Sequence, residues 1–147
     1  MKAVIMQAAG SVDDYTYFDH DADIGVVGRG ASLEAAFVSA ARATFALVTD
    51  IEAVRAVEHV AFDFEEGDIE IALVRWLNLL LGHAADRGLA LGRFAMRRDG
   101  NLWRGEAWGE RWRRELERGT DVKGATLTAL GVSREEGGWI ARCVVDV

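Results

Sequence analysis

The feature that most constrains the fold of this chain is the stretch of residues 69–81. Drawn as a helix, it is apolar around almost its whole circumference and is interrupted only by Glu70, Arg75 and Asn78. A surface helix keeps one polar face, so a helix that lacks such a face must be covered on more than one side. The stretch is too short and carries too many polar groups to cross a bilayer. It is therefore either a central helix or a helix that keeps one face for a partner protein.

A second helix and two strands are predicted before this stretch. In residues 33–48 apolar side chains recur at the helical period, and Ser32 stands at the position of an N-cap. The two strands are predicted at residues 23–30 and 52–64. Asp68 is placed to cap the central helix, and Arg87-Gly88 is placed to end it.

Beyond Gly88 the apolar period changes from that of a helix to that of strands. Four strands are predicted, at residues 90–98, 102–116, 121–133 and 138–147. Asp99-Gly100 is the strongest hairpin turn between them. This order predicts an α+β fold, a single domain with two helices packed on one face of a mixed, largely antiparallel β-sheet. We expect residues 15–147 to form this domain and residues 1–14 to be a leader or an edge segment.

Charge and cysteine content narrow the classes of function. The formal net charge of −7 disfavours nucleic-acid binding by the surface as a whole, because contacts to phosphates need Lys and Arg. Residues 93–118 are net positive, which indicates either a surface for a charged partner or a set of solvated strand positions. The one cysteine, Cys143, lies in an apolar run and cannot form an internal disulfide. We therefore expect a buried thiol and a cytoplasmic protein.

An acidic motif precedes the first predicted helix. Asp19, Asp21 and Asp23 stand at alternate positions, so an extended backbone would point all three carboxylates to one face. Carboxylate oxygens suit calcium or magnesium, whereas zinc or copper would need clustered His and Cys. The motif does not begin an EF-hand, because Ile24 and Gly30 occupy the positions of its Gly and Glu. It is either a site for a hard divalent ion or a solvated acidic turn.

A second acidic position lies at the other end of the sequence. Asp146 follows a run of valines in the last predicted strand, where a carboxylate is costly unless it has a partner. Val147 adds main-chain oxygens and a terminal carboxylate. If the last strand lies beside the strand that begins at Asp23, these three residues could surround one cation with oxygen ligands. We predict this joint site in preference to either motif alone, because it supplies both acidic groups with a charge partner.

Several motifs in this chain, in the same order, resemble the archease family. They are Asp-His-x-Ala-Asp-Ile-Gly at residues 19–25, Trp76-Leu77-Asn78, Asp121-Val122-Lys123 and the terminal Val145-Asp146-Val147. The matches extend from Tyr15 to Val147, and the first and last motifs are specific. The resemblance therefore covers nearly the whole predicted domain.

The resemblance implies a metal-binding accessory protein and not a stand-alone enzyme, so no catalytic residue is assigned. Archeases are cofactors of the tRNA-splicing RNA ligase, which uses GTP and manganese to join 3′-phosphate or cyclic-phosphate ends to 5′-hydroxyl ends. They promote guanylylation of the ligase's active-site histidine and support multiple turnover. The family's metal site, usually described with calcium, falls on Asp23, Asp146 and Val147. Its lysine falls on Lys123, a candidate contact to the ligase, its metal or its nucleotide. RNA would be reached only through the ligase, and no membrane contact is expected.

Three departures from the family pattern surround this site. Asp21 replaces the usual Thr and adds either a ligand or only charge. Residues 122–128 read Val-Lys-Gly-Ala-Thr-Leu-Thr, so an aromatic residue and a histidine of the family motif are lost, and a preceding family His is absent from residues 111–118. The alternative from another class is a metal-dependent phosphoester hydrolase. That function would need a nucleophile-activating group and a cleft, which no motif indicates.

Overall fold

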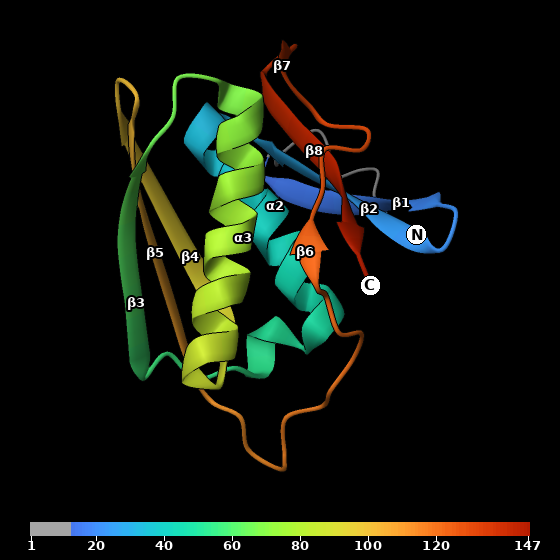
Figure 1. Ribbon diagram of the computed structural model, residues 1–147, viewed down its shortest axis with the longest axis vertical. Helices are drawn as coiled ribbons and strands as arrows, with labels where there is room; N and C mark the ends of the chain where they lie inside the picture. The colour runs from blue at the N-terminus through green and yellow to red at the C-terminus, as the bar shows by residue number, and fades with distance from the viewer. Residues whose placement is uncertain (1–12) are drawn as a thin grey trace.

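Two antiparallel sheets enclose two helices in the computed structural model, which describes residues 13–147 (Figure 1). In the first sheet the strands β1 (Asp14–His20), β2 (Asp23–Gly30), β8 (Gly138–Asp146) and β6 (Gly124–Ala125) follow in that order, and β7 (Gly131–Glu135) also pairs with β8. The second sheet has the order β3 (Glu58–Glu65), β5 (Leu102–Arg111), β4 (Leu89–Asp99). The helices are α2 (Leu33–Val48) and α3 (Ile69–Arg87), and a short 3-10 helix, η1 (Ile51–Ala53), follows α2.

The predicted α+β class with two helices is confirmed, but the strands are divided differently. They form two sheets with only antiparallel pairs among residues 13–147, in place of one mixed sheet. Both helices contact strands of both sheets, so they lie between the sheets and do not cover one face only (Figure 1). The burial of α3 explains why, because Leu73, Trp76 and Leu77 have no exposed surface. A helix that is apolar on several sides needs a layer on each of them, so α3 is the central helix.

The three polar residues of α3 bind the backbone of three other parts of the chain. Glu70 accepts a hydrogen bond from the N–H of Val132 in β7 at 3.4 Å. Arg75 donates to the carbonyl of Glu65 at the end of β3, at 2.7 Å. Asn78 makes two hydrogen bonds to β6. The polar positions of the predicted apolar stretch therefore tie α3 to its neighbours.

The ends of both helices follow the predicted capping residues. Ser32 Oγ accepts a hydrogen bond from the N–H of Ala35 at 3.0 Å, and Asp68 Oδ1 accepts one from Glu70 N at 2.9 Å. Gly88 ends α3 with a φ of 65°, in the left-handed region that glycine adopts without a steric penalty. These local signals need no tertiary contact, which is why they were readable in the sequence.

The largest difference from the predicted strands lies between β5 and β7. Residues 112–123, which we call the crossover segment, form no strand and carry the chain from the second sheet to the first (Figure 1). They pass the end of α2, where Gly119 N and Thr120 N each donate to an α2 carbonyl at 2.7 Å. Residues that cross between the sheets cannot form a continuous strand in either one. The strand predicted at 102–116 therefore ends at Arg111, and the strand predicted at 121–133 is replaced by β6 and the start of β7.

Two further expectations concern the chain as a whole. The predicted leader, residues 1–14, lies almost entirely outside the described residues, and β1 begins at Asp14. Within residues 13–147, no helix combines the length and apolar character that a membrane span requires.

Candidate metal-binding site

The two acidic positions, Asp23 at the start of β2 and Asp146 at the end of β8, lie side by side at one end of the first sheet (Figure 1). Strands β2 and β8 pair antiparallel, with Ile24 opposite Val145 as the last pair of the register. Beyond that pair, the N–H of Val147 donates a hydrogen bond to Asp23 Oδ1 at 3.2 Å. Positions 124 residues apart in the sequence are thus in direct contact.

Asp23 and Asp146 occupy facing positions of these two strands. Continuing the β2–β8 register by one residue places Asp23 opposite Asp146. Directly opposed residues of an antiparallel pair share a face, with Cβ atoms about 4.5–5.5 Å apart, and like charges there are destabilising. A cation beside both carboxylates would remove this repulsion. The register therefore gives a physical reason for a cation at this position.

Lys123 is held at the same place by β6. Gly124 pairs with Asp146 from the other side of β8, and the N–H of Lys123 donates to the carbonyl of Asp146 at 2.8 Å. The structure thus brings Asp23, Lys123, Asp146 and Val147 together, and we call this group the acidic edge. Asp146 and Lys123 are exposed, whereas Asp23 and Val147 are half-buried.

The donor atoms of the acidic edge fit a hard divalent cation. They are two carboxylates and the main-chain oxygens of Val147, and calcium takes six to eight oxygen ligands. Among residues 13–147 there is no group of three His, Cys, Asp or Glu side chains close enough to hold a metal ion. The edge would therefore supply only part of a coordination shell, and water or another molecule would supply the remainder.

The expectation that Asp19, Asp21 and Asp23 share one face is wrong, because a hairpin turn falls inside the motif. Strand β1 ends at His20 and β2 begins at Asp23. Asp21 lies in the turn with a φ of 53°, and its side chain is 94% exposed. Asp19 pairs with Ile24, which places it on the face of the sheet opposite to that of Asp23. Only Asp23 of the three belongs to the acidic edge.

Sequence reasoning recognised Asn78 only as part of the resemblance and as an interruption of an apolar helix. In the structure its side chain binds both backbone groups of Ala125, two residues after Lys123. A polar residue inside an otherwise apolar helix was the available signal. The sequence could not show that Asn78 binds Ala125, because that contact depends on where β6 lies relative to α3.

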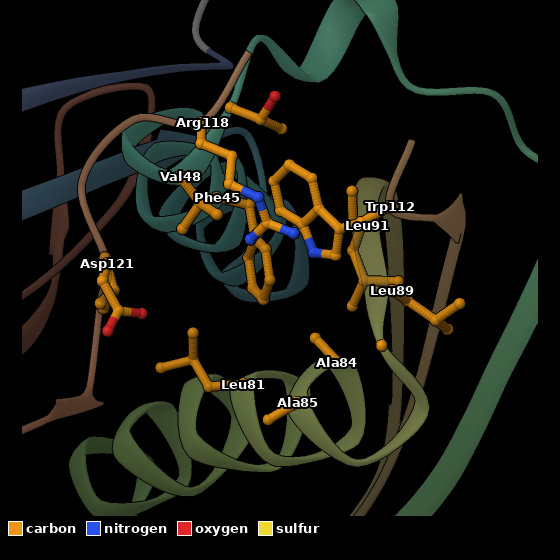
Figure 2. Close-up of a pocket in the computed structure, with 14 residues that line it drawn as sticks. Phe45, Val48, Leu81, Ala84, Ala85, Leu89, Leu91, Trp112, Arg118 and Asp121 are labelled. Carbon is orange, nitrogen blue, oxygen red and sulfur yellow. The ribbon is translucent and has the colours of Figure 1, made fainter. Parts of the chain in front are cut away.

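A pocket of about 350 Å³ lies beside the crossover segment, between the last turns of α2 and α3 and the start of β4 (Figure 2). Its walls are mainly apolar, and its charged lining residues are Arg118 and Asp121. The Arg118 guanidinium lies 3.9 Å from the centroid of the Trp112 ring. The lining of the pocket contains neither a histidine nor a cysteine, and Thr49 is among its polar residues.

Cys143 is a buried thiol, and the arginine-rich residues 93–118 include solvated strand positions. Cys143 is fully buried, and burial raises the pKa of its thiol to about 12. On the second sheet Arg97 lies opposite Arg104, but Arg104 also lies opposite Asp63 of β3, and β5 carries Glu106 as well. Both signs of charge alternate along these strands, as is typical of a solvated sheet face.

Comparisons with known proteins agree over nearly the whole chain. The sequence profile of the archease protein family matches residues 15–147. Archease proteins of Sulfolobus acidocaldarius and Saccharolobus solfataricus are 38% and 34% identical over 136 residues, which cover 90% of this chain and 98% of each relative. The solution structure of protein 1598 of Methanobacterium thermoautotrophicum superimposes with a TM-score of 0.76 at 28% identity, covering 90% of this chain and 98% of that one. A crystal structure from Thermotoga maritima, described as an archease and possible chaperone, shares the fold with a TM-score of 0.58 at 20% identity, covering 88% of this chain and 94% of that one. The chain therefore belongs to the archease family.

Proposed function

We propose that this protein is a metal-binding activator of a tRNA-splicing RNA ligase of the type that joins 3′-phosphate to 5′-hydroxyl ends with GTP. It would promote guanylylation of the ligase's histidine and multiple turnover, and it would not catalyse a reaction itself. The single observation that carries the proposal is the convergence of Asp23, Lys123, Asp146 and Val147 at one edge of the first sheet. The family's metal and partner residues, retained in this sequence, would thus act from one place.

The chemistry of the acidic edge suits an accessory role. Asp23 and Asp146 hold negative charge at the place where the backbone of Lys123 binds Asp146, so the edge would offer carboxylates to a divalent cation and a lysine to the phosphate or carboxylate groups of a partner. When bound, calcium would supply positive charge and open coordination positions. Because the edge provides only part of a ligand shell, a docked partner can complete it.

The position of the edge also suits docking. Asp146, the last residue of β8, and Lys123, the residue before β6, are both exposed where these two paired strands lie side by side (Figure 1). A catalytic centre usually lies in a concave pocket that excludes water. An exposed edge of mixed charge is better suited to insertion into the site of another protein, which in this proposal is the ligase. RNA would be contacted through that ligase, in the cytoplasm.

Reconstitution with the cognate ligase tests the proposal. We expect the protein to increase both the guanylylation of the ligase and the number of joined ends per ligase, and we expect Asp23→Asn and Asp146→Asn to lose most of this effect. Asp63→Asn, an exposed carboxylate on the other sheet, is the matched control and should activate normally. If the unmodified protein leaves guanylylation and turnover unchanged, the activator proposal is wrong.

A further inference from the structure

Asn78 of α3 supplies the hydrogen-bonding groups that a neighbouring strand would supply. Its Nδ2 donates to the carbonyl of Ala125 at 3.1 Å, and its Oδ1 accepts from the N–H of Ala125 at 2.8 Å. In a sheet, the two backbone groups of one residue are satisfied together by the strand alongside. Because β8 lies on one side of β6, the Asn78 amide takes the place of a strand on the other side.

Strand β6 is short and needs this second support. It has only two residues, Gly124 and Ala125, and it follows the crossover segment, which has no regular structure. Gly124 loses more backbone entropy on ordering than other residue types do. A Cβ at Gly124 would lie 3.3 Å from Asn78 Oδ1, so the glycine leaves room for the amide to approach. The contact is therefore made by a matched pair of residues, one on the helix and one on the strand.

The same strand sets the position of Lys123. Gly124 pairs with Asp146, and Lys123 N donates to the carbonyl of Asp146 at 2.8 Å. Neither the pairing of Gly124 with Asp146 nor the hydrogen bond of Lys123 N can form unless β6 lies along β8. The hydrogen bonds of Asn78 to Ala125 therefore act on the acidic edge through Gly124 and Lys123. The side chain of Asn78 binds Ala125 and neither of the two carboxylates.

We propose that Asn78 is a positioning residue that holds Lys123 beside Asp146, so that α3 determines the geometry of the acidic edge. The consequence for ligase activation rests on the proposed function, whereas the consequence for the backbone of residues 123–125 does not. The two consequences are therefore measured separately.

Amide hydrogen exchange tests the structural part. In Asn78→Ala we expect the amides of Lys123 and Ala125 to exchange roughly tenfold faster, because one or two hydrogen bonds that hold them are lost. Arg75→Ala is the matched control, since Arg75 lies on the same helix and binds the Glu65 carbonyl away from β6. Its exchange at Lys123 and Ala125 should equal that of the unmodified protein. Unchanged exchange in Asn78→Ala, or an equal increase in Arg75→Ala, would overturn the proposal.

Activator titration into the ligase tests the functional part. Asn78→Ala should raise the activator concentration for half-maximal guanylylation by the same factor as Lys123→Ala, and the double variant should be no weaker than Lys123→Ala alone. Asn78→Asp keeps the acceptor for Ala125 N and should recover part of both effects.

The possible results separate the two proposals. If the unmodified protein fails to activate, the proposed function is wrong, and the exchange experiment still decides whether Asn78 positions Lys123. If the unmodified protein activates and Asn78→Ala activates equally well despite faster exchange, the positioning role is wrong. Additive losses in the double variant would also contradict it.

Discussion

Glu110, near the end of β5, anchors the start of the crossover segment. The residue is only 5% exposed. Its Oε1 accepts a hydrogen bond from Arg113 Nε at 2.8 Å, and its Oε2 accepts one from the N–H of Arg55 at 2.8 Å. One carboxylate therefore joins the crossover segment to the segment that follows η1. We predict that Glu110→Gln destabilises the protein, because it weakens the attachment of the crossover segment and of the segment that follows η1.

The magnitude follows from these two bonds. Glutamine keeps one acceptor oxygen and turns the other into a donor, which would face either the Arg113 guanidinium or the Arg55 N–H. Hydrogen bonds to charged groups contribute about 1.5–3 kcal/mol, and loss of a buried pair costs about 3–5 kcal/mol. Arg113 is 25% exposed, so we expect the lower part of these ranges, about 2–4 kcal/mol in the free energy of unfolding. For a domain of this size that loss lowers Tm by about 5–15 °C.

The effect should depend on pH in a known direction. The pKa of Glu110 is lowered in the folded protein, first by the hydrogen bond from Arg113 and then by the N–H of Arg55, and burial opposes this shift. A carboxyl with a lowered pKa stabilises the fold above its unfolded pKa, and this stabilisation is lost as the pH falls through the folded value. The difference in Tm between Glu110→Gln and the unmodified protein should therefore be large at neutral pH and should shrink on acidification.

Thermal unfolding at several pH values measures this difference. Glu117→Gln is the matched control, because Glu117 is an exposed residue of the same segment. It should unfold within about 1 °C of the unmodified protein, as is usual for exposed substitutions. A Glu110→Gln variant as stable as Glu117→Gln at neutral pH, or a difference that does not change on acidification, would refute the reasoning.

Three further predictions concern the acidic edge and the core. In calorimetric titrations with calcium, Asp146→Ala should bind at least tenfold more weakly than the unmodified protein, whereas Asp19→Asn should bind normally because Asp19 faces the opposite side of the sheet. Cys143 should react with a thiol reagent at pH 8 only after unfolding, because the folded thiol is buried with a pKa of about 12; rapid labelling of the folded protein would contradict this. Gly28→Ala should lower the free energy of unfolding by about 1–3 kcal/mol in denaturant titration, because its Cβ would meet the α2 backbone; a change below 0.5 kcal/mol would show that α2 shifts without cost.

The local features of this fold were predictable because their causes are local. Ser32, Asp68 and Gly88 mark helix ends through bonds and dihedral angles within a few residues of each position. The apolar circumference of residues 69–81 required cover on several sides, and α3 is indeed central. Asp23, Asp146 and Val147 were also predicted in the sequence to share one cation site, from the charge-pairing argument and from the family resemblance.

Tertiary structure decided which strands pair and therefore which side chains meet. A hairpin turn such as Asp99-Gly100 indicates that β4 pairs with β5, but a strand pattern alone does not identify a distant partner, so the division into two sheets and the route of residues 112–123 could not be derived from it. The turn at Asp21 separates Asp19 from Asp23, and the pairing of β2 with β8 places Asp23 beside Val147. Asn78 gained its partner only when β6 folded along α3. Residue types set what each position can bind, whereas contacts between distant segments determine what it does bind, because those contacts depend on the packing of the whole chain.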